Sequence, residues 1–173
     1  MDMIGDYGYV DGESVFRSAL PAARNIAPLR KRAAEAGVPV IFVNDNFGAW
    51  RNDFASTVEM AKRSERGSQI LELLPPSPDD YHVLKPQRSG FFATPLALLL
   101  SALGSKRVIL TGVTTDMCVL FTAQDAYMRG FNIVVPHDCC GAVMPEHHDQ
   151  TVELLARITK ADIRPAAEIE IAG

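Results

Sequence analysis

Short, uniformly apolar runs alternate along the chain with longer segments in which apolar residues recur every three or four positions. The short runs predict buried strands, at 38–43, 81–84, 107–112 and 131–135, with a last edge strand at 166–171. The longer segments predict helices at 22–36, at 57–74, after Pro95, after Cys118 and at 146–159. Strands separated by helices form parallel βαβ units, so we expect an α/β protein, a three-layer αβα sandwich with a mostly parallel central sheet.

Composition narrows the class of protein. A chain of 173 residues with 47% hydrophobic content suits a single domain over residues 1–173. The net charge of −4 and the scattered basic residues argue against nucleic-acid binding. The longest apolar stretch, 93–103, is too short to cross a membrane. The cysteines are odd in number and we recognise no leader, so we expect a cytoplasmic protein.

The turn at 112–118 carries the strongest chemical signal, because it places Cys118 where a buried strand passes into a helix. The N–H groups and the positive dipole end of a helix N-terminus stabilise a thiolate, so we expect a lowered pKa for Cys118. The same N–H groups can bind an oxyanion. The alternative is that Cys118 is a small buried apolar residue.

Active sites in such sheets lie at the carboxyl ends of the strands. The candidate residues there and in the first few positions are Asp45, Lys85, Cys118, Asp138, Asp2 and Asp6. Lys85 follows a strand directly, and its ammonium would favour a nearby thiolate. A carboxylate would protonate the leaving group and later activate water. The alternative for Lys85 is an ordinary surface lysine.

Three segments, 2–7, 84–96 and 112–119, resemble the isochorismatase-like cysteine hydrolases, and the resemblance extends over almost the whole chain. It implies a Rossmann-like isochorismatase-type fold and a catalytic triad of Asp2, Lys85 and Cys118. It also implies a cis peptide between Val113 and Thr114, which would aim the backbone amides of Thr114 and Cys118 at an oxyanion.

The resemblance implies hydrolysis of a C–N bond, of amide or carbamoyl type, in a small molecule. Cys118 would attack the carbonyl carbon, Asp2 would move the protons, and a Cys118 thioester would be hydrolysed. Two alternatives stay open: a vinyl ether hydrolase like the isochorismatases proper, and a non-catalytic binding protein of the same fold. We expect no cofactor, and a homodimer or homotetramer.

Nicotinamidases of this superfamily hold a metal with an Asp-x-His pair and further histidines, whereas residues 44–53 here contain no histidine. Imidazole suits zinc and iron, so we expect no metal and an activity that survives a chelator. We expect Phe47, Trp50 and Phe92 to form an apolar pocket with Asn44 or Arg51 as a polar anchor. The alternative places these aromatic side chains in the core or in oligomer contacts.

The beginning of the chain departs most from the family, whose members usually have an apolar strand before the triad aspartate. Here Asp2 follows Met1 directly, so the first strand is apparently truncated. We therefore expect a frayed terminus and a gain in stability and activity when an apolar strand is added upstream. Equal behaviour of the two forms would show either that Asp2 needs no strand behind it or that Asp6 or Asp45 is the acid.

Overall fold

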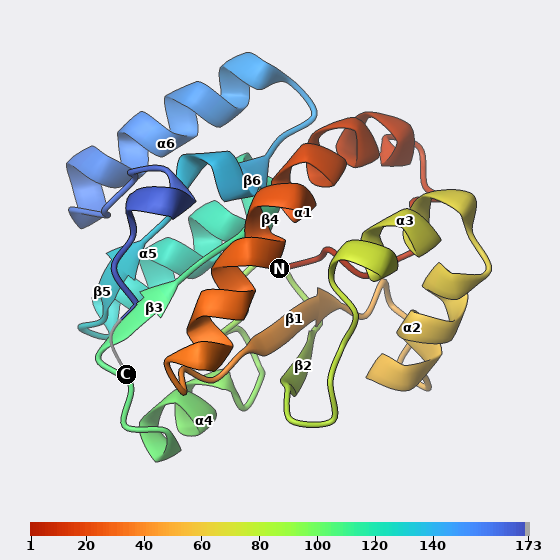
Figure 1. The fold of residues 1–173 in the computed structure, drawn as a ribbon, viewed down its shortest axis with the longest axis horizontal. Helices are drawn as coiled ribbons and strands as arrows, with labels where there is room; N and C mark the ends of the chain where they lie inside the picture. The colour runs from red at the N-terminus through yellow and green to blue at the C-terminus, as the bar shows by residue number, and fades with distance from the viewer. Residues whose placement is uncertain (172–173) are drawn as a thin grey trace.

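The computed structural model describes residues 1–171, and its strands lie at the centre with helices around them (Figure 1). The helices are α1 (Gly12–Glu35), α2 (Phe54–Lys62), α3 (Glu65–Leu73), α4 (Leu96–Ala102), α5 (Leu120–Met128) and α6 (Pro145–Thr159). The strands are β1 (Ile41–Asp45), β2 (Tyr81–Lys85), β3 (Arg107–Ile109), β4 (Gly112–Val113), β5 (Asn132–Val134) and β6 (Cys140–Gly141). A π-helical turn at Thr115–Val119 and 3₁₀ turns at His137–Cys139 and Ala166–Glu168 complete the elements.

The strands pair in parallel, as β1 with β2, β3 with β5 and β4 with β6. In the first pair Asp45 lies opposite Lys85, so both strands end at the same level. The predicted parallel sheet is therefore confirmed.

Two apolar clusters lie on opposite faces of the strands. One joins α1, α2 and α3 to the sheet through Phe42 and Val113, and the other joins α4, α5 and α6 to it through Val43 and Val108. Neighbouring strand residues point to opposite faces, which is why Phe42 and Val43 belong to different clusters. This arrangement confirms the three-layer sandwich. In the part of the chain that the structure describes, no helix is long and apolar enough to cross a membrane.

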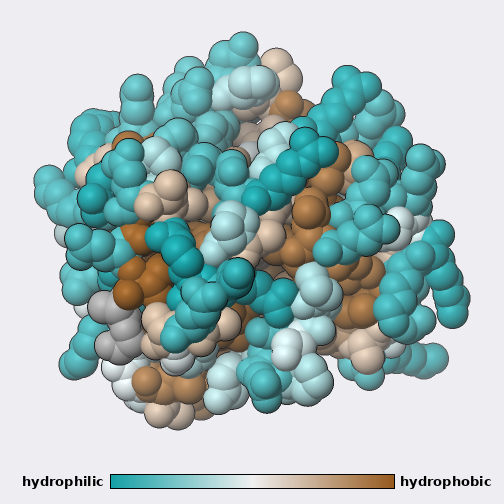
Figure 2. Space-filling model, viewed as in Figure 1, coloured by the Kyte–Doolittle hydropathy of each residue, from teal (hydrophilic) through white to brown (hydrophobic). Residues whose placement is uncertain are grey.

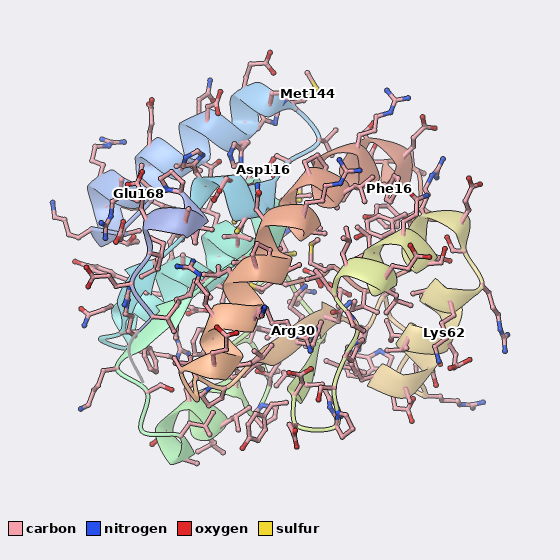
Figure 3. All side chains as sticks on the ribbon, viewed as in Figure 1. Phe16, Arg30, Lys62, Asp116, Met144 and Glu168 are labelled. Carbon is pink, nitrogen blue, oxygen red and sulfur yellow. The ribbon has the colours of Figure 1, made fainter. Side chains whose placement is uncertain are left out.

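Helix α1 is longer than predicted, because it begins at Gly12 rather than at residue 22 and contains Pro21 and Pro28. Each proline removes a helical hydrogen bond, but α1 buries one face against the sheet along most of its length, and this packing outweighs the local loss. Arg30 extends from α1 over β1 (Figure 3) and forms an ion pair of 2.5 Å with Asp80. Figure 2 shows one face of the molecule, on which hydrophilic residues predominate and apolar residues are exposed in smaller patches.

The predicted edge strand at 166–171 is wrong. Its first residues form the 3₁₀ turn, and within residues 1–171 the only strand-like contact nearby is a bridge between Val134 and Asp162. The guanidinium of Arg32 donates to the carbonyls of Ala166 and Ile169, and the Asp138 carboxylate accepts from Ala166 N–H. These side chains bind backbone groups that a ladder would otherwise use.

Residues 1 and 2 lie between β1 and β4 and form hydrogen bonds to the chain on both sides. The Met1 ammonium donates to Thr111 O at 2.5 Å, and Val113 N–H donates to Met1 O at 3.1 Å. On the other side Asp2 N–H donates to Val43 O at 2.9 Å. Gly112 permits this approach, because a Cβ there would lie 2.0 Å from Met1 O. Between β1 and β3, beyond Met1, the described chain supplies no strand.

Candidate active site

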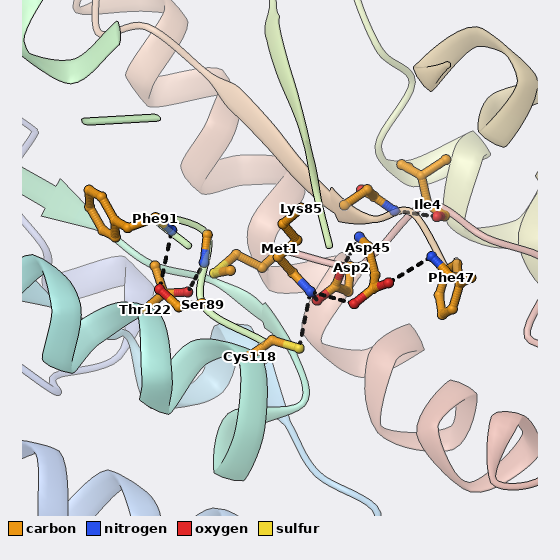
Figure 4. Close-up of polar contacts among 12 residues, drawn as sticks. Met1, Asp2, Ile4, Asp45, Phe47, Lys85, Ser89, Phe91, Cys118 and Thr122 are labelled. Carbon is orange, nitrogen blue, oxygen red and sulfur yellow. Dashed lines mark hydrogen bonds and ion pairs between the residues drawn. The ribbon is translucent and has the colours of Figure 1, made fainter. Parts of the chain in front are cut away.

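Asp2, Lys85 and Cys118 meet at the carboxyl ends of the strands (Figure 4). The ammonium of Lys85 lies 3.0 Å from Asp2 Oδ2, and it donates to Cys118 Sγ at 3.4 Å. It also lies 3.0 Å from Asp45 Oδ2. The Lys85 side chain has no exposed area, so one buried cation links two carboxylates and a thiol.

The backbone fixes both charged partners of the lysine. Lys85 and Asp45 end adjacent strands in register, which brings their side chains together. Asp2 is held by its N–H bond to Val43 and by Asp45 N–H, which donates to Asp2 Oδ1 at 2.6 Å. The expected frayed terminus is therefore not found, because residues 1 and 2 are bound on both sides.

Cys118 lies within the π-helical turn that leads into α5, rather than at the first position of an α-helix. The turn starts where Met117 and Val119 N–H both donate to Thr114 O at 3.2 Å. The peptide between Val113 and Thr114 is cis. Among residues 1–171, Thr114 N–H has no hydrogen-bond acceptor.

The resting thiol is protonated, contrary to the predicted lowered pKa. Burial, followed by the Asp2 carboxylate, raises the pKa of Cys118 to about 12, and the opposite effect of Lys85 is smaller. Burial alone would lower the pKa of Lys85, but Asp2, Cys118 and Asp45 together raise it above its ordinary value. The site therefore holds an ammonium ion, two acidic side chains and a neutral thiol next to Asp2.

The four predicted substrate-binding residues do not form one pocket. Asn44 is buried and its amide donates to Ile4 O, so the structure gives it a structural role instead of a binding one. Phe47 lies beside the triad, because its N–H donates to Asp45 Oδ1 at 2.7 Å. Trp50 and Phe92 are 78% and 56% exposed, and within the described chain no hydrogen bond or aromatic pair joins their side chains to the triad.

Two residues near the triad received no role, or only a secondary one, in the sequence analysis. Tyr9 stacks on Phe47 with ring centroids 6.0 Å apart. Burial, then the nearby charges of Asp2 and Cys118, raise the pKa of Tyr9 to about 12. The second residue is Asp45, which the sequence marks as a candidate because it ends a strand. No sequence pattern marks Tyr9.

Two histidines and two further cysteines form no hydrogen bond or ion pair with the triad in the described chain. His147 approaches Asp116 at 3.5 Å, and His148 shares a hydrogen bond of 2.8 Å with Thr115. Cys139 and Cys140 are buried free thiols. Within residues 1–171, no three His, Cys, Asp or Glu side chains gather in a way that could hold a metal ion.

The fold and this site define a class of hydrolase, and comparison with known proteins gives the family. A model of the Isochorismatase domain matches residues 9–163, and the chain therefore belongs to the isochorismatase family. The isochorismatase family protein YaaI of Bacillus subtilis is 31% identical over 169 residues, which cover 98% of this chain and 93% of YaaI.

Solved structures share the fold. N-carbamoylsarcosine amidase from Thermoplasma acidophilum is 28% identical, with a TM-score of 0.69, covering 89% of this chain and 87% of the amidase. The nicotinamidase SaPncA of Staphylococcus aureus is 22% identical, with a TM-score of 0.69, covering 95% of this chain and 93% of the nicotinamidase. At that identity the nicotinamidase supports the fold alone.

Proposed function

We propose that the protein is a cysteine-dependent hydrolase that cleaves a C–N bond, of amide or carbamoyl type, in a small molecule. The observation that carries this proposal is the contact of the Lys85 ammonium with both Cys118 Sγ and Asp2 Oδ2. The similarity to N-carbamoylsarcosine amidase supports the same bond type.

The proposed reaction begins with transfer of the Cys118 proton to Asp2 as Sγ bonds to the carbonyl carbon. The raised pKa of the thiol makes this transfer necessary, because little thiolate exists before substrate binds. The oxyanion accepts hydrogen bonds from Thr114 N–H and Cys118 N–H, and the Lys85 ammonium stabilises the negative charge that forms on sulfur.

The tetrahedral intermediate then collapses. The C–N bond breaks, Asp2 returns its proton to the leaving nitrogen, and a thioester remains on Cys118. Water attacks this thioester while Asp2 takes a proton from the water. The C–S bond breaks, the sulfur recovers that proton from Asp2, and a carboxylic or carbamic acid leaves.

A panel of small primary amides, carbamoyl compounds and lactams tests the proposal, with release of ammonia or amine as the readout. The matched control is the Cys118→Ala protein assayed at the same concentration. Mass spectrometry of enzyme quenched during turnover is expected to show an acyl adduct on Cys118 and none on Cys139 or Cys140. Turnover that is equal in the two proteins would contradict the mechanism.

A further inference from the structure

The two adjacent histidines of α6 contact the turn that carries Cys118. Nδ1 of His148 shares a hydrogen bond of 2.8 Å with the hydroxyl of Thr115, and Nδ1 of His147 lies 3.5 Å from a carboxylate oxygen of Asp116. Thr115 and Asp116 are the first two residues of the π-helical turn. Two consecutive residues of one element thus meet two consecutive residues of another, and the proposed reaction uses neither histidine.

The two contacts differ in their surroundings. Thr115 has no exposed area, and within residues 1–171 its hydroxyl has no hydrogen-bond partner other than His148. The His147 side chain is 58% exposed, so water competes for its contact with Asp116 and makes that contact weak. The hydrogen bond between His148 and Thr115 is therefore the one that can hold the turn.

Packing of α6 against the core fixes the position of His148. The residues three, four and seven positions further along the helix are buried, namely Thr151, Val152 and Leu155. Residues at this spacing share one face of a helix, so His148 lies on the face of α6 that packs inward. Leu155 belongs to the same apolar cluster as Val119, the last residue of the π-helical turn. The helix and the turn are thus packed against one core.

The hydroxyl of Thr115 is attached one residue after Thr114, whose N–H is a proposed donor to the oxyanion. Before Thr114, the chain is fixed because Val113 of β4 pairs with Gly141 of β6. After Thr114, the hydrogen bond between Thr115 and His148 fixes the chain to α6. The direction of the Thr114 N–H therefore depends on strand pairing on one side and on the contact with His148 on the other.

We propose that His148 is a positioning residue for the attack of Cys118, because through Thr115 it keeps the Thr114 N–H aimed at the oxyanion. This inference rests on the proposed function, which places the oxyanion beside that N–H. His148 forms no hydrogen bond or ion pair with the triad within the described chain. Its removal should slow the addition of Cys118 to a carbonyl carbon and should not slow reactions of the same thiol that form no oxyanion.

The geometry of the hydrogen bond defines the variants of His148. Burial lowers the pKa of His148, so the imidazole is neutral at neutral pH and a neutral side chain can take its place. In His148→Asn an amide atom takes the position of Nδ1, one bond beyond Cγ, and keeps a partner for the Thr115 hydroxyl. His148→Leu removes that partner, and leucine is a better helix former than histidine, so the change does not lower the helix propensity of α6.

The experiment compares two reactions of Cys118 in the 173-residue chain. In acylation by p-nitrophenyl acetate, Sγ bonds to the carbonyl carbon, an oxyanion forms, and p-nitrophenolate leaves while the thiol proton passes to Asp2. In alkylation by iodoacetamide, Sγ bonds to the methylene carbon, iodide leaves and the thiol proton passes to the buffer, with no oxyanion. Peptide mapping by mass spectrometry assigns both adducts. The ratio of the two rate constants isolates the oxyanion step, since both reactions use the same thiol.

We expect this ratio to fall by about 10-fold or more in His148→Leu and in Thr115→Val, and to stay within about twofold of the original in His148→Asn. His147→Leu is the matched control and should also stay within about twofold. Combining His148→Leu with Thr115→Val should lower the ratio no further than either change alone. An unchanged ratio in His148→Leu or in Thr115→Val would overturn the proposal, and so would an equal fall in His148→Asn or in His147→Leu.

The same measurements separate this inference from the proposed function. If the ratio depends on His148 but the original chain cleaves none of the amides in the panel, the proposed hydrolysis fails and the positioning role stands. If the chain cleaves amides and the ratio does not depend on His148, the proposed function stands and this inference fails. Absence of acylation at Cys118 in the original chain would overturn both. Thr115→Val keeps the shape of its side chain, so it decides the matter if His148→Leu does not fold.

Discussion

The ammonium of Lys85 lies 3.0 Å from the carboxylate of Asp2, and both groups are taken out of water: the Lys85 side chain has no exposed area and that of Asp2 is 10% exposed. A pair buried to this degree is held by its geometry, since each charge has lost most of its hydration. The residues are 83 positions apart, so the pair also ties the start of the chain to the end of β2. Stability and activity should therefore respond together when Lys85 is changed.

Replacement of Lys85 by methionine keeps the volume of the side chain and removes its charge. We expect the free energy of unfolding to fall by about 3–5 kcal/mol, because the carboxylates of Asp2 and Asp45 lose their shared partner. Amide turnover should fall by at least about 100-fold. Thermal unfolding and kcat of Lys85→Met measure the two effects. A variant of normal stability that also kept its turnover would show that the pair is dispensable.

Replacement of Cys118 by alanine should affect the chemistry alone. We expect loss of turnover by about 10³-fold or more, because no thioester can form. Cys118 is only partly buried, so its melting temperature should stay close to that of the original protein. Cys139→Ala is the matched control, since it removes a fully buried thiol in the cluster beneath α1 and should lower stability while keeping turnover.

The identity of the acid is tested by comparing Asp2→Asn with Asp45→Asn. Both carboxylates lie 3.0 Å from Lys85 Nζ, but only Asp2 also interacts with the Cys118 thiol. We expect Asp2→Asn to lower kcat by about 10²–10⁴-fold and Asp45→Asn to lower it by less than about tenfold. The reverse order would make Asp45 the proton carrier.

The sequence predicts most of this site because its residues follow local rules. Lys85 and Asp45 end strands, and strand ends meet at one edge of a parallel sheet, so their proximity follows from the pattern alone. The position of Cys118 follows in the same way from the change of strand into helix. The catalytic role proposed for Asp2 rests on the family resemblance, since no local rule places this residue.

The properties that sequence reasoning missed depend on distant contacts. Burial and the carboxylate of Asp2, which is 116 positions away, raise the pKa of Cys118. Both effects oppose the lowering of this pKa that the start of a helix would cause. Asn44 is buried and donates a hydrogen bond to Ile4 O. The residues predicted to form an edge strand at 166–171 bind Arg32 through their carbonyl groups. Each of these outcomes needs tertiary packing that no local pattern encodes.

The pH dependence of alkylation tests the state of the thiol. With a pKa of about 12, the thiolate fraction of Cys118 is small at neutral pH and rises tenfold for each pH unit. We expect the rate of iodoacetamide addition to Cys118, in the absence of substrate, to rise without a plateau from pH 7 to pH 10. Peptide mapping by mass spectrometry separates this reaction from Cys139 and Cys140. A plateau below pH 8 would instead indicate a preformed thiolate.

Gly112 offers the sharpest test of how Asp2 is held. A Cβ at Gly112 would lie 2.0 Å from Met1 O and 2.6 Å from Met1 N, so Gly112→Ala must displace the first residues, and its φ of +114° adds strain. Gly104→Ala is the matched control, because Gly104 also has a positive φ, of +66°, but a Cβ there would meet nothing within 4 Å.

We expect Gly104→Ala to cost about 1 kcal/mol of stability with turnover unchanged, since only backbone strain is added. Gly112→Ala should cost about 3 kcal/mol or more and lower kcat by about 100-fold, because Asp2 moves away from Cys118 when Met1 is displaced. Thermal melts and amide turnover of the two variants decide the matter. If both variants lost the same stability and kept full turnover, the contact of Met1 with Gly112 would have no part in placing Asp2.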